Sequence, residues 1–235
     1  MNAFDWNILS FFSHFARHSY TFDTAVYLLT RTDTPKGAVV MSLLYWAWNK
    51  HDDDRSRELL VLTVIGCFIA ALSNKLVSAV TFYRPRPIQE HLSLVFPYGP
   101  DLSVLKNSNA FPSDHASLFA ALSMGITLVD SEVGLVCWIY SLVFICLPRI
   151  YMGFHHPTDI LAGIANGGLV MWLLLREGVR RRLSKPLGRL RAAYPGPFFA
   201  VFFFLTFEIA TLFEGSREIA SFWAGVAKNL LHHAA

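Results

Sequence analysis

The chain has 235 residues, of which 54% are hydrophobic and only 16% are charged, with a formal net charge of +3. Soluble domains carry roughly 25% charged residues, so this composition argues against an ordinary soluble protein and favours a membrane protein. The length allows one domain of helical spans without a separate soluble module, and the charge gives no indication of a nucleic-acid partner. We therefore predict a single membrane domain over residues 1–235, with the motif-bearing core at 57–176.

The N-terminal segment, residues 3–31, is amphipathic rather than uniformly apolar. Aromatic and aliphatic residues recur at helical spacing from Phe4 to Phe15, but four polar side chains interrupt the rest: Arg17, His18, Asp23 and Arg31. This pattern favours a pair of helices at the membrane interface, with a seventh transmembrane span as the alternative.

Six apolar runs follow, and each is close to the roughly 17–25 residues that a helix needs to cross a bilayer. They cover residues 36–49, 57–81, 115–130, 132–149, 156–176 and 195–213. The sequence therefore predicts an all-α fold, a polytopic membrane bundle of about six transmembrane helices preceded by interfacial helices.

Basic residues gather in two connections between these runs. Residues 176–191 hold seven Lys or Arg side chains and one acid, Glu177, and the short connection at 50–57 is also basic. Short basic connections stay on the cytoplasmic side of a membrane. The opposite ends of the helices are therefore expected to face outward, together with the polar segment 82–114, which is predicted to be an exposed loop over the site.

Three polar clusters belong to this outward-facing end. They are Lys75 with Arg84 and Arg86, then Ser113 with His115, and then Arg149 with His155 and Asp159. A phosphate dianion needs several positive donors in a fixed geometry, and the planar guanidinium of arginine binds two phosphate oxygens at once. We predict that the lysine and the three arginines bind substrate phosphate, and that Ser113 adds an uncharged donor at a helix N-terminus.

Two histidines and one carboxylate supply the expected chemistry. Asp159 follows His155 by four residues, so one helical face brings the carboxylate to the imidazole. A carboxylate that holds one ring nitrogen leaves the other free to attack phosphorus, and His115 is expected to protonate the departing oxygen. The neighbouring His156 would point away on such a helix and is given no role. Because arginines supply the positive charge, neither a metal nor another cofactor is predicted.

The clusters resemble the signature of the type 2 phosphatidic acid phosphatase superfamily, which is Lys-x6-Arg-Pro, then Pro-Ser-Gly-His, then Ser-Arg-x5-His-x3-Asp. The third motif matches from Arg149 to Asp159, with Pro148 in the place of the serine. The second motif reads Pro-Ser-Asp-His at residues 112–115. The resemblance covers residues 75–160 by motif.

The first motif departs from that signature. Lys75 precedes Arg84 by nine positions rather than seven, and Val77 occupies the position of the family lysine. Alignment on Arg86 instead would place Ala79 there, so neither register restores the lysine. Arg84 is the better match to the family arginine, and Arg86 is an expected second contact.

The resemblance implies roles for three residues. In the superfamily the third-motif histidine forms a phosphohistidine intermediate, the aspartate supports it and the second-motif histidine is the acid, which implies these roles for His155, Asp159 and His115. The Pro-Ser-Asp-His and Arg-Pro-Arg-Pro runs are similar to the bacterial undecaprenyl diphosphate phosphatase branch. This similarity implies an enzyme of the bacterial inner membrane that hydrolyses undecaprenyl diphosphate to the monophosphate, with its site facing the periplasm or cell exterior.

Two other functions stay open at this point. The same pocket fits another lipid phosphate, such as phosphatidic acid, phosphatidylglycerol phosphate or a lipid-linked sugar phosphate. From a different class, the chain could be a non-enzymatic lipid carrier transporter. In each case the expected partners are a lipid phosphate or diphosphate and the bilayer, and no protein partner is predicted.

Overall fold

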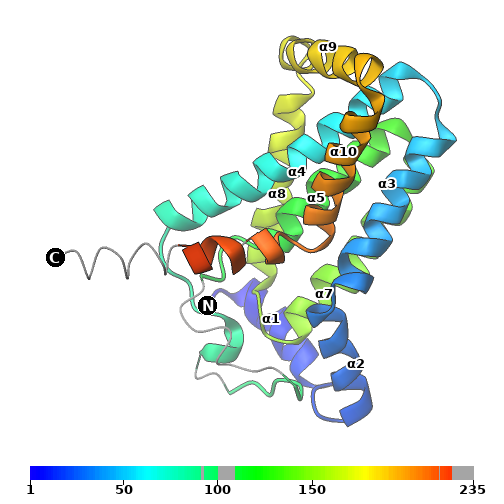
Figure 1. Ribbon diagram of the computed structural model, residues 1–235. Helices are drawn as coiled ribbons and strands as arrows, with labels where there is room; N and C mark the ends of the chain where they lie inside the picture. The colour runs from blue at the N-terminus through cyan, green and yellow to red at the C-terminus, as the bar shows by residue number, and fades with distance from the viewer. Residues whose placement is uncertain (91–92, 100–108, 217, 224–235) are drawn as a thin grey trace.

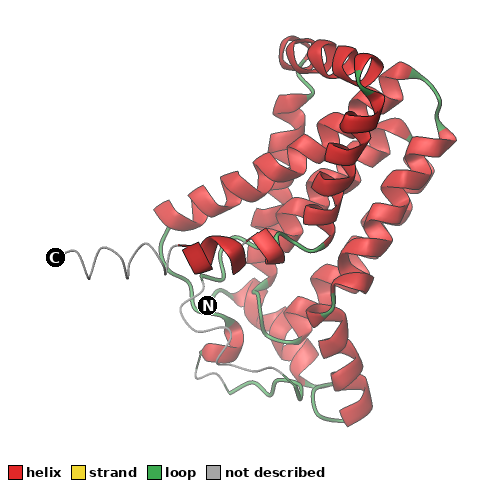
Figure 2. Ribbon diagram, viewed as in Figure 1, coloured by secondary structure: helices red, strands yellow, loops and turns green. Residues whose placement is uncertain are grey.

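The computed structural model describes residues 1–90, 93–99, 109–216 and 218–223, and all the regular secondary structure in those ranges is helical (Figures 1 and 2). The principal helices are α1 (Ala3–Ser13), α2 (Tyr20–Arg31), α3 (Val39–Lys50), α4 (Asp54–Val80), α5 (Asp114–Val129), α6 (Ser131–Tyr140), α7 (Leu147–Tyr151), α8 (Pro157–Leu174), α9 (Glu177–Ala193) and α10 (Pro195–Ala210). Two π-helical segments, η1 (Thr34–Ala38) and η3 (Ser141–Cys146), and the 3-10 turn η2 (Pro87–Gln89) complete the order. The predicted all-α class is confirmed.

Among the described residues, three helices are long and apolar enough to cross a membrane. They are α4, the continuous helix Ser131–Tyr151 made of α6, η3 and α7, and α8. A fourth span results if α10 and the helix Glu214–Trp223, which meet at a bend of 87°, count as one broken span. The predicted count of six is therefore not reproduced.

Two of the predicted spans are too short because their ends are set by polar or irregular residues. The run at 36–49 yields only the 12 residues of α3, since a π-helical segment containing Pro35 precedes it. The run at 115–130 yields the 16 residues of α5, which begins after the capping residue Ser113 and ends at Asp130. The basic segment at 176–191, which was predicted as a connection, forms the helix α9.

The N-terminal segment forms two helices rather than one long span. Helix α1 has 11 residues and α2 has 12, and Arg17 between them adopts a positive φ of 65°. This backbone conformation cannot continue a right-handed helix. The paired arrangement expected from the sequence is thus present, at the end of the bundle where α7 terminates (Figure 1).

The centre of the bundle is the contact of α5 with α4 and α8. A Cβ atom at Gly167 of α8 would lie 2.1 Å from the carbonyl oxygen of Ser117 of α5, and one at Gly163 would lie 2.5 Å from that of Ser113. Only glycine allows the two backbones to approach so closely. Asn166 then joins three helices, because its Nδ2 donates to the carbonyl of Ala70 at 3.1 Å and to Oγ of Ser117 at 2.7 Å.

The close approach of these helices brings several ends together at one side of the bundle. The end of α4, the start of α5, the end of α7 and the start of α8 meet there (Figure 1). Gly153 makes the turn between α7 and α8 with φ 69°, and a Cβ there would lie 2.6 Å from the ring of Phe96. The predicted loop at 82–114 also reaches this end, although its residues 91–92 and 100–108 lie outside the described part of the chain.

Candidate active site

A cavity of about 340 Å³ opens at this end of the bundle. Four of the predicted site residues line it, namely Arg86, His115, Arg149 and His155. They come from the loop after α4, from α5, from α7 and from the turn before α8. The fold therefore brings together side chains that belong to all three sequence clusters.

The two arginines supply buried positive charge at the cavity. Arg149 is only 7% exposed, and its Nη2 donates to Nε2 of His115 and to the carbonyl of Thr30 at 3.5 Å. Its Nε is buried with no hydrogen-bond partner among the described residues. Arg86 donates from Nη1 to the carbonyl of Phe154 at 2.7 Å. A buried guanidinium donor without an acceptor favours binding of an anion such as phosphate.

His155 is held as a neutral imidazole. Its Nδ1 lies 2.9 Å from the carbonyl oxygen of Ala110, and because a carbonyl only accepts, Nδ1 carries the proton and Nε2 keeps its lone pair. The side chain is buried, and this burial lowers the pKa of His155 well below 6.5. The positive charges of Arg86 and Arg149 lower this pKa further. The arrangement suits a nucleophile, since an unprotonated ring nitrogen is required for attack.

Asp159 does not make the hydrogen bond to His155 that the spacing predicts. Its Oδ2 is 3.9 Å from Nδ1 of His155 and instead accepts from the backbone N–H of His156 at 2.8 Å. Its Oδ1 accepts from Nη1 of Arg84 at 2.6 Å. In this structure the carbonyl of Ala110, rather than a carboxylate, fixes the tautomer of His155, while the charge of Asp159 lies close by.

Arg84 is occupied by two buried carboxylates and is not among the cavity-lining residues. Besides Asp159, it donates from Nη2 to Oδ2 of Asp5 at 2.7 Å and from Nη1 to Oγ1 of Thr158 at 2.8 Å. Asp5 is fully buried, and although burial raises its pKa, hydrogen bonds from Thr158 and Arg84 leave the pKa below its usual value. Phosphate binding by Arg84 stays a prediction.

Asp5 belongs to none of the three motifs. It lies 79 positions before Arg84, and only its place as a carboxylate in an otherwise apolar helical segment could have indicated a buried partner. Asp5 also connects the N-terminal helix α1 to the start of α8, where Asp159 lies, because it accepts from the backbone N–H of Thr158.

His156 does not line the cavity, but its side chain turns inward to Asp159 rather than outward as expected. Its side chain is 1% exposed, with Nδ1 at 3.2 Å from Oδ2 of Asp159 and Nε2 at 3.4 Å from Oε1 of Glu90. The reason is local, because His156 is the N-cap of α8 with an extended backbone (ψ 151°). Helical periodicity therefore does not govern the direction of its side chain.

Two further predicted phosphate ligands lie away from the cavity. The side chain of Lys75 is 60% exposed, and its Nζ is 2.5 Å from Oδ2 of Asp114. Ser113 is fully buried, and its Oγ accepts from the backbone N–H of Ala116 at 3.5 Å, which caps α5. Asp114, which stands where the family signature has glycine, also accepts from Asn74 of α4 at 2.6 Å. Contacts of Lys75 and Ser113 with substrate stay predictions.

A lysine that the sequence analysis did not consider lines the cavity. Lys36 is 5% exposed and lies 3.0 Å from Oδ1 of Asp33 and 3.3 Å from the carbonyl of Arg31. It stands at the first position of an apolar run, where a lysine is usually taken as an interfacial anchor. Its burial beside the cavity was visible only in the folded chain.

A pH-dependent stability is expected from the buried His155. An unfolded histidine binds a proton below pH 6.5, whereas the folded side chain resists protonation, so stability should fall as the pH decreases below 6.5. Thermal unfolding in neutral detergent between pH 8 and pH 5 measures this. The His155→Gln variant should show a weaker decline than the unchanged protein, and an equal or steeper decline would contradict a neutral buried His155.

Comparison with known proteins places this site in a family. The model of the PAP2 superfamily matches residues 58–182, which include His115, Arg149, His155 and Asp159. No solved structure gave a significant match.

Three curated relatives share parts of the chain. The undecaprenyl-diphosphatase BcrC of Bacillus subtilis is 24% identical over 68% of this chain and 77% of its own. The bacitracin transport permease protein BcrC of Bacillus licheniformis is 25% identical over 54% of this chain and 58% of its own. The lipid A 1-phosphatase of Rhizobium etli is 30% identical over 46% of this chain and 44% of its own. With the family model covering more than half of the residues, the chain belongs to the PAP2 superfamily.

Proposed function

We propose that this protein is a membrane phosphatase that hydrolyses undecaprenyl diphosphate, or another polyprenyl diphosphate, to the monophosphate and inorganic phosphate. The observation that carries the proposal is the meeting of a buried, neutral His155 with His115, Arg86 and Arg149 at one cavity. A nucleophile, an acid and two cations are the groups that phosphoryl transfer without a metal requires.

In the first step, Nε2 of His155 attacks the terminal phosphorus, and the bond from that phosphorus to the bridging oxygen breaks. His115, protonated at Nε2 once Arg149 turns from it to the phosphoryl oxygens, gives that proton to the bridging oxygen, which leaves as part of the polyprenyl monophosphate. Arg86 and Arg149 neutralise the charge that spreads over the phosphoryl oxygens. In the second step, water loses a proton to His115 and attacks the phosphohistidine, which releases phosphate and restores His155.

In this proposal Asp159 and Arg84 support the nucleophile His155 without contacting the substrate. The carboxylate of Asp159 lies 3.9 Å from Nδ1 of His155 and is close enough to stabilise the positive charge that develops on the ring as the phosphohistidine forms. Arg84 holds that carboxylate in place from 2.6 Å. Through a second contact, with Asp5, Arg84 supplies positive charge that compensates both buried carboxylates.

Two observations support a polyprenyl diphosphate as the substrate. The chain is similar to the undecaprenyl-diphosphatase of Bacillus subtilis, and it carries the Pro-Ser-Asp-His and Arg-Pro-Arg-Pro runs. The basic helix α9 supports an orientation with this helix in the cytoplasm and the cavity facing the periplasm or cell exterior of a bacterial inner membrane. The second candidate function is removal of phosphate from a lipid-linked sugar phosphate, favoured by the likeness to the lipid A 1-phosphatase.

The test is phosphate release by detergent-purified protein from undecaprenyl diphosphate, phosphatidic acid and lipid A in parallel, with a strong chelator present. We expect release from the diphosphate at least about tenfold faster than from the other two lipids, unchanged by the chelator, since Arg86 and Arg149 provide the charge stabilisation. In the described part of the chain no group of three or more His, Cys, Asp or Glu side chains is placed to hold a metal ion.

A result that differs from this expectation would change the proposed substrate or the proposed mechanism. Faster phosphate release from lipid A than from undecaprenyl diphosphate would favour the second candidate function. Loss of release in chelator, restored by a divalent cation, contradicts the metal-independent mechanism. Release from none of the lipids by a folded protein contradicts the enzyme proposal itself.

A further inference from the structure

Helix α9 lies across the end of the bundle that is opposite the catalytic cavity (Figure 1). Helix α8 begins beside that cavity at Pro157, has 18 residues and ends at Leu174, shortly before α9 begins at Glu177. At 1.5 Å per residue this helix is roughly 27 Å long, which is close to the thickness of the hydrocarbon core of a bilayer. In a membrane, α9 therefore lies near one surface and the catalytic cavity near the other.

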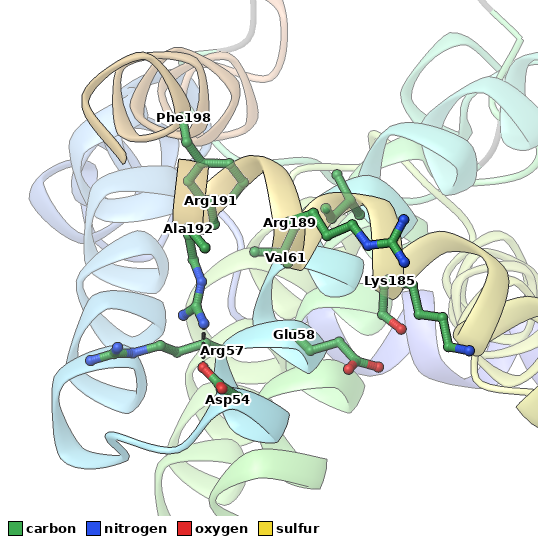
Figure 3. A pocket seen from close by; sticks show the side chains of 12 residues that line it. Asp54, Arg57, Glu58, Val61, Lys185, Arg189, Arg191, Ala192 and Phe198 are labelled. Carbon is green, nitrogen blue, oxygen red and sulfur yellow. Dashed lines mark hydrogen bonds and ion pairs between the residues drawn. The ribbon is translucent and has the colours of Figure 1, made fainter. Parts of the chain in front are cut away.

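A second cavity, of about 320 Å³, lies between α9 and the start of α4 (Figure 3). Four basic side chains line it, together with two acidic ones: Arg57, Lys185, Arg189 and Arg191, with Asp54 and Glu58. Figure 3 shows Lys185 and Arg189 on one side of the cavity and Arg57 on the other. The lining carries more positive than negative charge, which favours an anionic occupant.

Both acids of this second cavity are already paired with arginines of α9. Asp54 accepts from Arg191, and Glu58 accepts from Arg180 at 2.9 Å. Lys185 has no carboxylate partner among the described residues, and the same holds for Arg189. The surplus charge is therefore not neutralised within this part of the protein.

Two buried donors at the same place lack an acceptor. Nε of Arg57 and Nη1 of Arg191 are buried without a hydrogen-bond partner among the described residues. Each of these guanidiniums binds one carboxylate through another nitrogen, on Asp52 and Asp54 respectively. A buried guanidinium that lacks one acceptor has its charge only partly compensated, which adds to the positive potential at the cavity.

An apolar groove of about 180 Å³ adjoins the second cavity and shares three lining residues with it, Val61, Leu187 and Phe198. The groove continues between α4 and α10 past Val64 and Val201, and no charged side chain lines it. Because α4 spans the membrane, this groove runs from the basic cavity toward the hydrocarbon region. Its shape and polarity fit an acyl chain.

We propose that this end of the protein binds an anionic phospholipid, with the phosphate in the basic cavity and one acyl chain in the apolar groove. A soluble phosphate would neutralise the surplus positive charge of the cavity but would leave the groove unfilled, so the geometry favours the lipid. The site is separate from the catalytic cavity and does not depend on the proposed substrate.

The test is native mass spectrometry of the detergent-purified full chain titrated with phosphatidylglycerol or with phosphatidylcholine of the same acyl chains. We expect tighter binding of phosphatidylglycerol, and binding roughly 25-fold weaker in the double variant Lys185→Gln, Arg189→Gln, because each basic side chain near an anionic lipid contributes about fivefold. Glycerol 3-phosphate serves as the soluble headgroup and should bind far more weakly than the lipid.

The matched control is the double variant Arg181→Gln, Arg182→Gln, which removes the same charge from exposed positions of α9 outside the second cavity. It should keep nearly all of the phosphatidylglycerol affinity, and thermal unfolding in neutral detergent should show that both variants are folded. Equal weakening in the two variants would indicate diffuse surface attraction and overturn the proposal. So would equal affinity for the two lipids, or binding of glycerol 3-phosphate as tight as that of the lipid.

Discussion

Replacement of His155 by Gln is expected to lower phosphate release by at least about a thousandfold, because His155 is the nucleophile of the proposed mechanism and glutamine cannot replace it. Glutamine retains a donor for the carbonyl of Ala110, so the variant should stay folded. Release of inorganic phosphate in detergent, measured under substrate saturation, gives the loss in kcat directly. Radiolabelled substrate quenched in alkali should give phosphorylated protein with His155 and none with the variant.

The control for this prediction is His18→Gln, the same substitution at an exposed histidine in the N-terminal segment. It should leave both kcat and protein phosphorylation unchanged. A non-enzymatic carrier transporter would keep its function when His155 is replaced. Full phosphate release by folded His155→Gln protein would therefore remove the nucleophile assignment.

Replacement of Arg84 by Gln should lower the free energy of unfolding by about 3–5 kcal/mol, because removal of one partner leaves buried charges uncompensated. Asp5 and Asp159 are fully buried, and Arg84 contacts both, at 2.7 and 2.6 Å. Chemical unfolding in a fixed detergent measures the loss. The double variant Asp5→Asn, Arg84→Gln should lose less than the sum of the two single variants, since their side chains form one network.

The comparison variant is Arg86→Gln, which makes the same change at a cavity-lining arginine. Arg86 donates to the uncharged carbonyl of Phe154, so its replacement should cost less stability but should reduce phosphate release by the folded protein. If Arg84→Gln were as stable as the unchanged protein and only its KM rose, Arg84 would be a direct phosphate ligand rather than a positioning residue.

Four of the residues that line the candidate active-site cavity could be predicted, because their spacing is local and their chemistry is distinctive, whereas Lys36, which also lines it, could not. Arg149 and His155 are separated by one helical end and a turn, and the arginine-rich loop and the Pro-Ser-Asp-His run each supply polar groups that an apolar chain does not otherwise carry. Apolar composition similarly predicts helices, since a spanning segment must satisfy its own backbone hydrogen bonds. The number of spans was not predictable from composition, because the apolar runs at 36–49 and 115–130 form helices of only 12 and 16 residues, which is short for a helix that crosses a bilayer.

The sequence by itself therefore determined the all-helical membrane class, the family and the polar residues of the three motifs at one end of the bundle. Only the tertiary structure decided which of these side chains face the cavity and which are bound by other groups. Asp5 and Arg84 are 79 positions apart, and their contact exists because α1 packs against the start of α8. His156 reaches Asp159 because the capping position of α8 is extended rather than helical. Such pairings depend on packing over long sequence distances, which local spacing does not specify.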